Sequence, residues 1–277
     1  YLIPLLPFLA FVAIVLLFNR NSRLSGLTAI VAIGLSWVIS WAIVATAITT
    51  DHFYEHPIQL PLISIPTGTT MLSVGFTVDS LTALMLFMVP FVCLMIFIYS
   101  WGYMGVGKPK APANGHDEHG GHETVEEHGG HGGSKGKGWP AGPEFVDPMA
   151  SRFFAYISLF ATGMLGLVLA DSLVLLFIFW EIMGLCSYLL ISFWFARKYD
   201  DPNRITPKKA GFKAFITTRV GDAIMFCGMM ILYAAAAFLT DGQAGLTFSA
   251  LFSPEVLEGL QTLTILGISV ATLTAVL

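Results

Sequence analysis

Residues 175–194 read LLFIFWEIMGLCSYLLISFW, and this stretch decides the fold class. It is apolar from end to end apart from one carboxylate, Glu181. A run of about 18 or more apolar residues can cross the roughly 30 Å hydrocarbon core of a bilayer as an α-helix. The stretch therefore predicts a membrane-spanning helix with one ionisable group inside it.

The composition of the whole chain agrees with a membrane protein. Of its 277 residues, 55% are hydrophobic and 12% are charged, and the mean hydropathy is +0.74. A soluble domain carries about twice that share of charged residues. We therefore expect an all-α polytopic membrane protein.

The apolar runs predict about seven spans. The third begins at an N-cap, Asp79 or Ser80, and the sixth begins with Thr206 as N-cap and proline in the first turn. Because the sequence starts at Tyr1 rather than Met and stops inside an apolar run, we expect a fragment of a longer chain. The predicted spans cover residues 2–18, 24–48, 80–103, 153–170, 173–195, 207–239 and a seventh from about 260, cut off at 277.

Between the second and third spans lies LISIPTGTTMLSVGF, residues 62–76. Its alternating texture around Pro66, Thr67 and Gly68 is typical of a small β-hairpin. An irregular loop explains the same residues equally well, so both interpretations stay open.

Basic residues alternate between the predicted loops. The first, third and fifth loops contain lysine and arginine, whereas the second, fourth and sixth contain only acidic charges, among them Asp51, Asp171 and Glu255. Loops rich in lysine and arginine face the cytoplasm. We therefore expect the N-terminus outside. The basic loop residues are Arg20, Arg23, Lys108, Lys110, Lys135, Lys137, Arg152, Arg197, Lys198, Arg204, Lys208 and Lys209.

Glu181 lies ten residues after Asp171, which places it about 15 Å deep, near the middle of the bilayer. A charge there costs a few kcal/mol, and ionisable groups inside spans usually mark ion or proton paths. A protonatable carboxyl suits such a path because it can take up and release a proton. The alternative is a neutral carboxyl that only hydrogen-bonds between helices.

The sixth span carries charges of its own in KAGFKAFITTRVGD, residues 209–222. Arg219 and Asp222 are three residues apart, so they share a helix face and can pair. That pair could equally be structural. Lys213 lies nearer the cytoplasmic end, where its side chain could instead extend to the interface.

Residues 151–194, from SRFFAYISLF to SYLLISFW, together with KAFITTRVGD at 213–222, closely resemble the antiporter-like family. More narrowly, they resemble the L-subunit branch of bacterial NADH:quinone oxidoreductase, complex I, whose family is shared with multisubunit sodium/proton antiporters. Residues 78–104, VDSLTALMLFMVPFVCLMIFIYSWGYM, resemble the N-terminal module of that subunit. The resemblance implies an antiporter-like helix bundle and leaves out residues 106–148.

The resemblance also implies an organisation and a set of site residues. Residues 1–104 would form a three-span module with an external hairpin, 105–150 an insertion, and 151–277 the start of a proton-translocating repeat truncated in its seventh span. Glu181 would be the essential carboxylate, with Asp222, Arg219 and Lys213 as its charged partners. The family pairs that glutamate with a lysine in a broken seventh span, which lies beyond the present sequence.

The implied function is proton translocation coupled to electron transfer from NADH to quinone. No cofactor motif occurs in the sequence, so NADH, flavin, iron–sulfur clusters and quinone would belong to the wider complex. The expected partners are the other membrane subunits, including a neighbouring antiporter-like subunit, and the lipid bilayer. Nucleic acid is not expected. The expected location is a bacterial inner membrane.

The third loop departs from the family, which usually keeps it short. Here it contains HDEHGGHETVEEHGGHGG, residues 116–133. Histidine and glutamate can bind zinc, copper or nickel weakly, but the spacings match no closed site. A disordered cytoplasmic insertion is the favoured interpretation, because a segment this rich in glycine and charge cannot form a packed core. The five histidines are His116, His119, His122, His128 and His131.

Three alternative functions follow from the same residues. The nearest is the homologous subunit of a sodium/proton antiporter, or of a hydrogenase- or ferredoxin-linked complex. A divalent-metal transporter with a regulatory His-rich loop is disfavoured, because every histidine lies outside the spans. A purely structural subunit is disfavoured by Glu181 and the Arg219–Asp222 pair.

Overall fold

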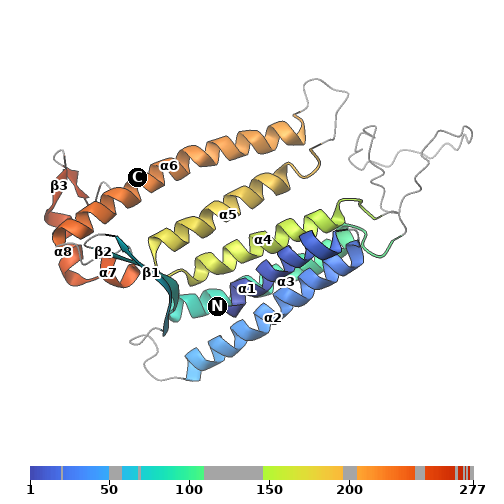
Figure 1. Cartoon of the computed structure of the whole chain (residues 1–277), viewed down its shortest axis with the longest axis horizontal. Helices are drawn as coiled ribbons and strands as arrows, with labels where there is room; N and C mark the ends of the chain where they lie inside the picture. Colours follow the sequence, from blue (N-terminus) through green and yellow to red (C-terminus); the bar gives the residue numbers. More distant parts are fainter. Residues whose placement is uncertain are drawn as a thin grey trace, which may run out of the picture.

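The computed structural model describes residues 1–19, 21–49, 58–67, 70–108, 146–195, 205–240, 247–265, 268–270, 272 and 274. Most of these residues are helical, and the helices run lengthwise through the molecule (Figure 1). The helices are α1 (Leu2–Ala13), its π-helical continuation η1 (Ile14–Phe18), α2 (Ser22–Thr49), α3 (Ser80–Tyr103), α4 (Ala150–Leu169), α5 (Leu173–Ile191), α6 (Pro207–Leu239), α7 (Phe248–Leu251) and α8 (Pro254–Thr262). The strands are β1 (Ile58–Thr67), β2 (Thr70–Val78), β3 (Thr264–Ile265) and β4 (Ile268–Ser269).

The long helices lie side by side, with α2 at one edge of the molecule and α6 at the other (Figure 1). Contacts join α2 to α3, α1 to α2 and α4, α4 to α5, and α5 to α6. Within the described residues, five helices are long and apolar enough to cross a membrane, and Leu2–Phe18 is a shorter apolar segment. The prediction of a polytopic α-helical membrane protein is therefore supported. The predicted count of seven spans is not.

The ends of α3 follow local chemistry. Asp79 is the N-cap residue, and its carboxylate accepts a 2.7 Å hydrogen bond from the backbone N–H of Thr82, as the sequence predicted. Beyond its other end, Gly105 adopts φ 62°, a left-handed conformation that glycine reaches without a steric penalty. At α6, Thr206 is the N-cap residue and Pro207 starts the helix, also as predicted.

The predicted seventh span, from about residue 260, is not confirmed as one continuous helix in the described residues. Helix α8 ends at Thr262, and the chain then forms the two short antiparallel strands β3 and β4. The segment TLTILGISV, residues 262–270, explains the difference. It is rich in threonine, isoleucine and valine, whose branched side chains disfavour helix and favour strand, and Gly267 weakens a helix further.

A β-hairpin connects α2 and α3 in the chain. Strands β1 and β2 pair antiparallel from Ile58↔Val78 to Thr67↔Thr70, with an irregularity between Pro61 and Ile63. The hairpin interpretation of this segment is thus confirmed, and the irregular-loop interpretation is not. Gly68, at the predicted turn, lies outside the described residues.

Asp171, between α4 and α5, joins three parts of the chain. Its carboxylate accepts a 2.7 Å hydrogen bond from Gly75 N–H of β2, and its own N–H donates to Gly75 O at 3.2 Å. On its other side, Asp171 O accepts from Phe248 N–H at 2.9 Å. The hairpin, the α4–α5 turn and α7 therefore form one hydrogen-bonded cap at the same end of the bundle (Figure 1).

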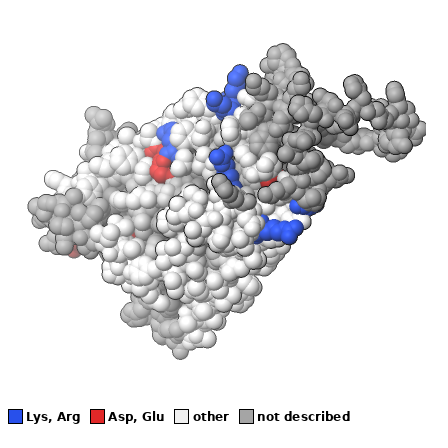
Figure 2. Space-filling model, turned by 45° about the vertical axis from the view of Figure 1, so that its right-hand side comes forward, with Lys and Arg blue, Asp and Glu red and all other residues white. Residues whose placement is uncertain are grey.

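Burial differs strongly along the row of helices. In the most apolar stretch of α4, 56% of the residues are buried, whereas in α5 the share is 11%. Phe154 of α4 and Leu86 of α3 are fully buried, which places the main core around α4. The face in Figure 2 is largely uncharged, with small groups of basic and acidic atoms set in it.

Candidate functional site

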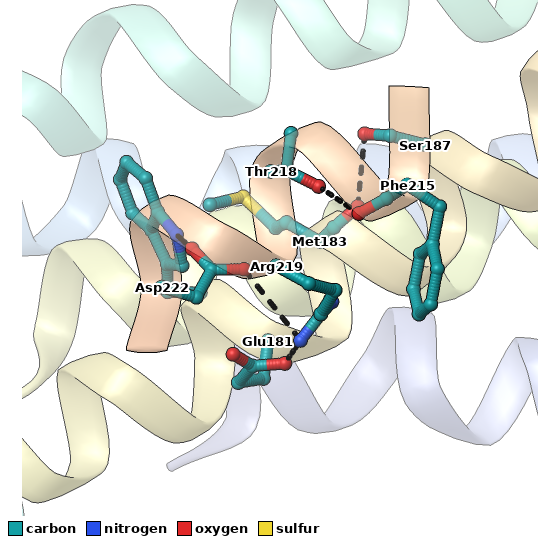
Figure 3. Close-up of polar contacts among 8 residues, drawn as sticks. Glu181, Met183, Ser187, Phe215, Thr218, Arg219 and Asp222 are labelled. Atoms are coloured by element: carbon teal, nitrogen blue, oxygen red, sulfur yellow. Dashed lines mark hydrogen bonds and ion pairs between the residues drawn. The ribbon is translucent and has the colours of Figure 1, made fainter. Parts of the chain in front are cut away.

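Helices α5 and α6 bring three charged side chains together inside the bundle (Figure 3). Glu181 comes from α5, about 12 Å along the axis from its first residue, and Arg219 and Asp222 come from α6. All three lie well inside helices of membrane-spanning length. The structure therefore brings together three of the charged residues that the sequence singled out.

Arg219 is shared between the two carboxylates. Its Nη1 forms an ion pair with Glu181 Oε2 and lies 3.6 Å from Asp222 Oδ2 (Figure 3). The side chains of Arg219 and Glu181 are 26% and 29% exposed, whereas that of Asp222 is 11% exposed. The predicted pairing of Arg219 with Asp222 is present, but the closer partner of Arg219 is Glu181.

Asp222 has a second donor. Trp180 Nε1 of α5 donates a hydrogen bond of 2.9 Å to Asp222 Oδ1, while Arg219 faces the other carboxylate oxygen, Oδ2. A length of 2.9 Å is near the most frequent value for an N–H···O hydrogen bond. Asp222 is thus held from both sides, once by a neutral donor and once by a cation.

The guanidinium of Arg219 occupies a space shaped by its neighbours. Its Cζ lies 4.7 Å from the centroid of the Phe215 ring, a cation–π distance. A Cβ atom placed on Gly184 would come within 2.7 Å of Arg219 Nη2, so glycine at this position makes room for the cation. Arg219 Nε is buried and has no hydrogen-bond partner among the described residues.

Two hollows flank the charged cluster. The larger, about 530 Å³, is lined mostly by apolar side chains of α4, α5 and α6, together with Trp180 and Asp222. The smaller, about 330 Å³, is lined by Glu181, Arg219 and Asp222 with apolar neighbours. Asp222 lines both hollows, so it lies in the wall between them.

The structure separates the other predicted site residue from this cluster. Lys213 is exposed and lies six residues, about 9 Å along the axis, before Arg219. It forms no ion pair with Glu181 or Asp222, all three of which the structure describes. His116, His119, His122, His128 and His131 lie outside the described residues. Within the described ranges, no three potential metal ligands gather.

Sequence reasoning missed Trp180. It directly precedes Glu181, and in an apolar span a tryptophan is usually an interfacial or packing residue. The available signal was its N–H group, which needs an acceptor when it is buried.

With one cation and two carboxylates, the ionised cluster carries one surplus negative charge. A proton or a cation can neutralise that charge.

Fold and cluster together define a helical protein with several helices of membrane-spanning length and a charged cluster between two of them. Residues 170–276 match the family described as "NADH:quinone oxidoreductase/Mrp antiporter, TM", and residues 65–112 match "NADH-Ubiquinone oxidoreductase (complex I), chain 5 N-terminus". Over these residues the chain belongs to the antiporter-like family of NADH:quinone oxidoreductase membrane subunits. The resemblance seen in the sequence is confirmed.

Curated relatives agree. The NAD(P)H-quinone oxidoreductase chain 5 of Synechocystis sp. is 34% identical over 87% of this chain and 28% of its own length. The chloroplastic subunit 5 of Adiantum capillus-veneris is 34% identical over 76% of this chain and 22% of its own. That of Nephroselmis olivacea is 35% identical over 76% and 25%. The chain thus spans about a quarter of the length of the curated relatives it matches.

Proposed function

We propose that this chain is part of a proton-translocating membrane subunit of a respiratory NADH:quinone oxidoreductase. The observation that carries the proposal is the Glu181–Arg219–Asp222 cluster, which lies between two apolar helices in a segment that matches the antiporter-like family. Glu181 takes up and releases the proton. Arg219 and Asp222 control how strongly Glu181 holds it, through their charges, and Lys213 serves the path from the basic end of the bundle.

The proposed architecture follows the same division as the sequence. Residues 1–104 are the N-terminal module, 105–150 an insertion, and 151–277 the beginning of the translocating repeat. NADH, flavin, iron–sulfur clusters and quinone belong to other subunits of the complex. The partners are the neighbouring membrane subunits, including another antiporter-like one.

Charge distribution supports an orientation. Arg23, Lys108 and Arg152 lie at the turns of one end of the bundle, and Lys208 and Lys209 at the start of α6 lie at that same end. The opposite end carries Asp171, Glu255 and Glu258. By the positive-inside rule, the basic end faces the cytoplasm. The N-terminus and the hairpin then lie outside a bacterial inner membrane.

The test uses Glu181→Gln in the complete complex, reconstituted into liposomes. Glutamine keeps the shape of the side chain but does not titrate. We expect proton pumping per NADH oxidised to fall at least tenfold, while the complex still assembles. Glu258→Gln is the matched control, because Glu258 is exposed on α8, away from the cluster. Normal pumping in Glu181→Gln would contradict the proposal.

One observation favours a second candidate function. The matching family description names Mrp antiporters as well as NADH:quinone oxidoreductases. A subunit of a sodium/proton antiporter would exchange sodium for protons without NADH oxidation. Purification of the native assembly separates the two candidates. Co-purified flavin and iron–sulfur subunits would support the respiratory complex, and their absence would support the antiporter.

A further inference from the structure

The charged cluster contains fewer cations than its carboxylates require. Within the part of the chain that the structure describes, Arg219 is the one cation that pairs with Glu181 and also lies 3.6 Å from Asp222. Two carboxylates that share one guanidinium compete for it, because pairing with one weakens its attraction to the other. The outcome of that competition decides how much of the positive charge Glu181 experiences.

Trp180 contacts one of the two competing carboxylates, Asp222. Its Nε1–H donates to Asp222 Oδ1 at 2.9 Å. The indole N–H is a donor that neither accepts nor titrates in the physiological range, so it stabilises the Asp222 carboxylate at every pH. An Asp222 that has this donor needs Arg219 less, and the guanidinium remains available to Glu181.

The two hollows show how both donors reach the same carboxylate. Trp180 and Asp222 line the larger hollow, whereas Glu181, Arg219 and Asp222 line the smaller. Trp180 and Glu181 are consecutive on α5, so their side chains leave the helix about 100° apart. Trp180 reaches Oδ1 of Asp222, while Arg219 faces the other oxygen, Oδ2.

We infer that Trp180 is a positioning residue that fixes how Arg219 is divided between Glu181 and Asp222. This inference rests on the proposed function and assigns the indole N–H a part in it. Without that N–H, Asp222 draws Arg219 away from Glu181. The protonation of Glu181, and with it the pH dependence of pumping, then changes.

The experiment compares Trp180→Phe, Asp222→Asn and the double variant in the complete reconstituted complex. We expect Trp180→Phe to reduce proton pumping per NADH oxidised about fivefold and to shift its pH profile. The double variant should be no worse than Asp222→Asn alone, because the indole acts through that carboxylate. Losses that multiply, or an unshifted pH profile, would overturn the inference.

Two further variants keep the test decisive. Trp37→Phe is the matched control, because Trp37 Nε1 in α2 has no hydrogen-bond partner among the described residues, and we expect it to pump normally. If Trp180→Phe does not assemble, the benzothienyl analogue of tryptophan can replace Trp180, since it has sulfur in place of N–H at nearly the same shape. Normal pumping and an unshifted pH profile with that analogue would equally overturn the inference.

The outcome is distinguishable from a failure of the proposed function itself. If Glu181→Gln abolishes pumping while Trp180→Phe behaves like Trp37→Phe, the proton-translocation proposal stands and only the role of Trp180 falls. If Glu181→Gln pumps normally, the proposed function fails, whatever the Trp180 variants show.

Discussion

The buried hydroxyls of α4 and the charged side chains of the α5–α6 pair find their hydrogen-bonding partners in different places. In α4, Ser158 donates to Phe154 O at 2.7 Å and Thr162 donates to Ser158 O at 3.0 Å, so these buried hydroxyls bond to their own helix. In α5 and α6, Trp180, Glu181 and Arg219 find their partners across the helix boundary. Hydroxyls satisfied within one helix leave its packing unchanged, whereas charges satisfied between helices can exchange partners.

The largest expected effect concerns the packed side of this comparison. Phe154 is fully buried, beneath α2 and α3. Phe154→Ala leaves a cavity and should lower the free energy of unfolding by about 3–5 kcal/mol, measured by thermal unfolding in detergent. Phe226→Ala on α6 is the control, because Phe226 is 45% exposed and should cost much less. Equal losses would mean that the two regions are packed alike.

The next prediction concerns the charged cluster of α5 and α6. Asp222→Asn removes one of the two negative charges next to Arg219 and should reduce proton pumping per NADH oxidised about fivefold, since partly exposed ion pairs contribute about 1 kcal/mol. Glu181→Gln should be more severe. The double variant should be little worse than Glu181→Gln alone. Losses that add in free-energy terms would show that the two carboxylates act independently.

Two glycines of the α5–α6 pair, Gly184 and Gly221, test how much pumping depends on the position of Arg219. Gly184→Ala places a Cβ within 2.7 Å of Arg219 Nη2, so the guanidinium must move, and we expect pumping to fall about two- to threefold. Gly221→Ala meets no atom within 4 Å and should leave pumping unchanged. The same assay measures both variants. A normal Gly184→Ala would show that the exact position of Arg219 does not matter.

The smallest effect is expected from the segment that connects α3 and α4 in the chain. Residues 114–138 are polar and rich in glycine, so they offer no apolar surface for packing. Deleting them should leave assembly and electron transfer intact, as judged by co-purification and NADH oxidation. If the deleted chain does not assemble, this segment binds a partner, and the α1–α4 region depends on more than its own packing.

The sequence predicted some element boundaries closely. The span predicted at 80–103 is α3, Ser80–Tyr103, because Asp79 and Gly105 mark its ends through a cap and a left-handed turn. The seventh span is not confirmed as one helix, because hydropathy alone does not distinguish a helix from a β-branched apolar run. The hairpin required pairing partners that only the folded chain provides.

The site was predicted in part. Spacing alone places Arg219 near Asp222, since residues three apart share a helix face. The contact of Arg219 with Glu181 depends instead on how α5 is rotated about its own axis. An almost uniformly apolar helix shows no preferred face in its sequence, so that rotation cannot be predicted from it. For the same reason, the sequence did not predict the hydrogen bond between Trp180 and Asp222.

The hydrogen bonds of Asp171 also affect how helix α5 can move. They fix the end of α5 at Leu173, and only a small share of that helix is fully buried. When α5 tilts about this fixed N-terminal end, Glu181 moves with it, because it lies about 12 Å along the helix axis. A tilt of about 5° would move Glu181 by about 1 Å, enough to lengthen a hydrogen bond beyond its useful range. The hydrogen-bonded cap at Asp171 is thus the fixed point about which a small tilt of α5 would change the charge partners of Glu181.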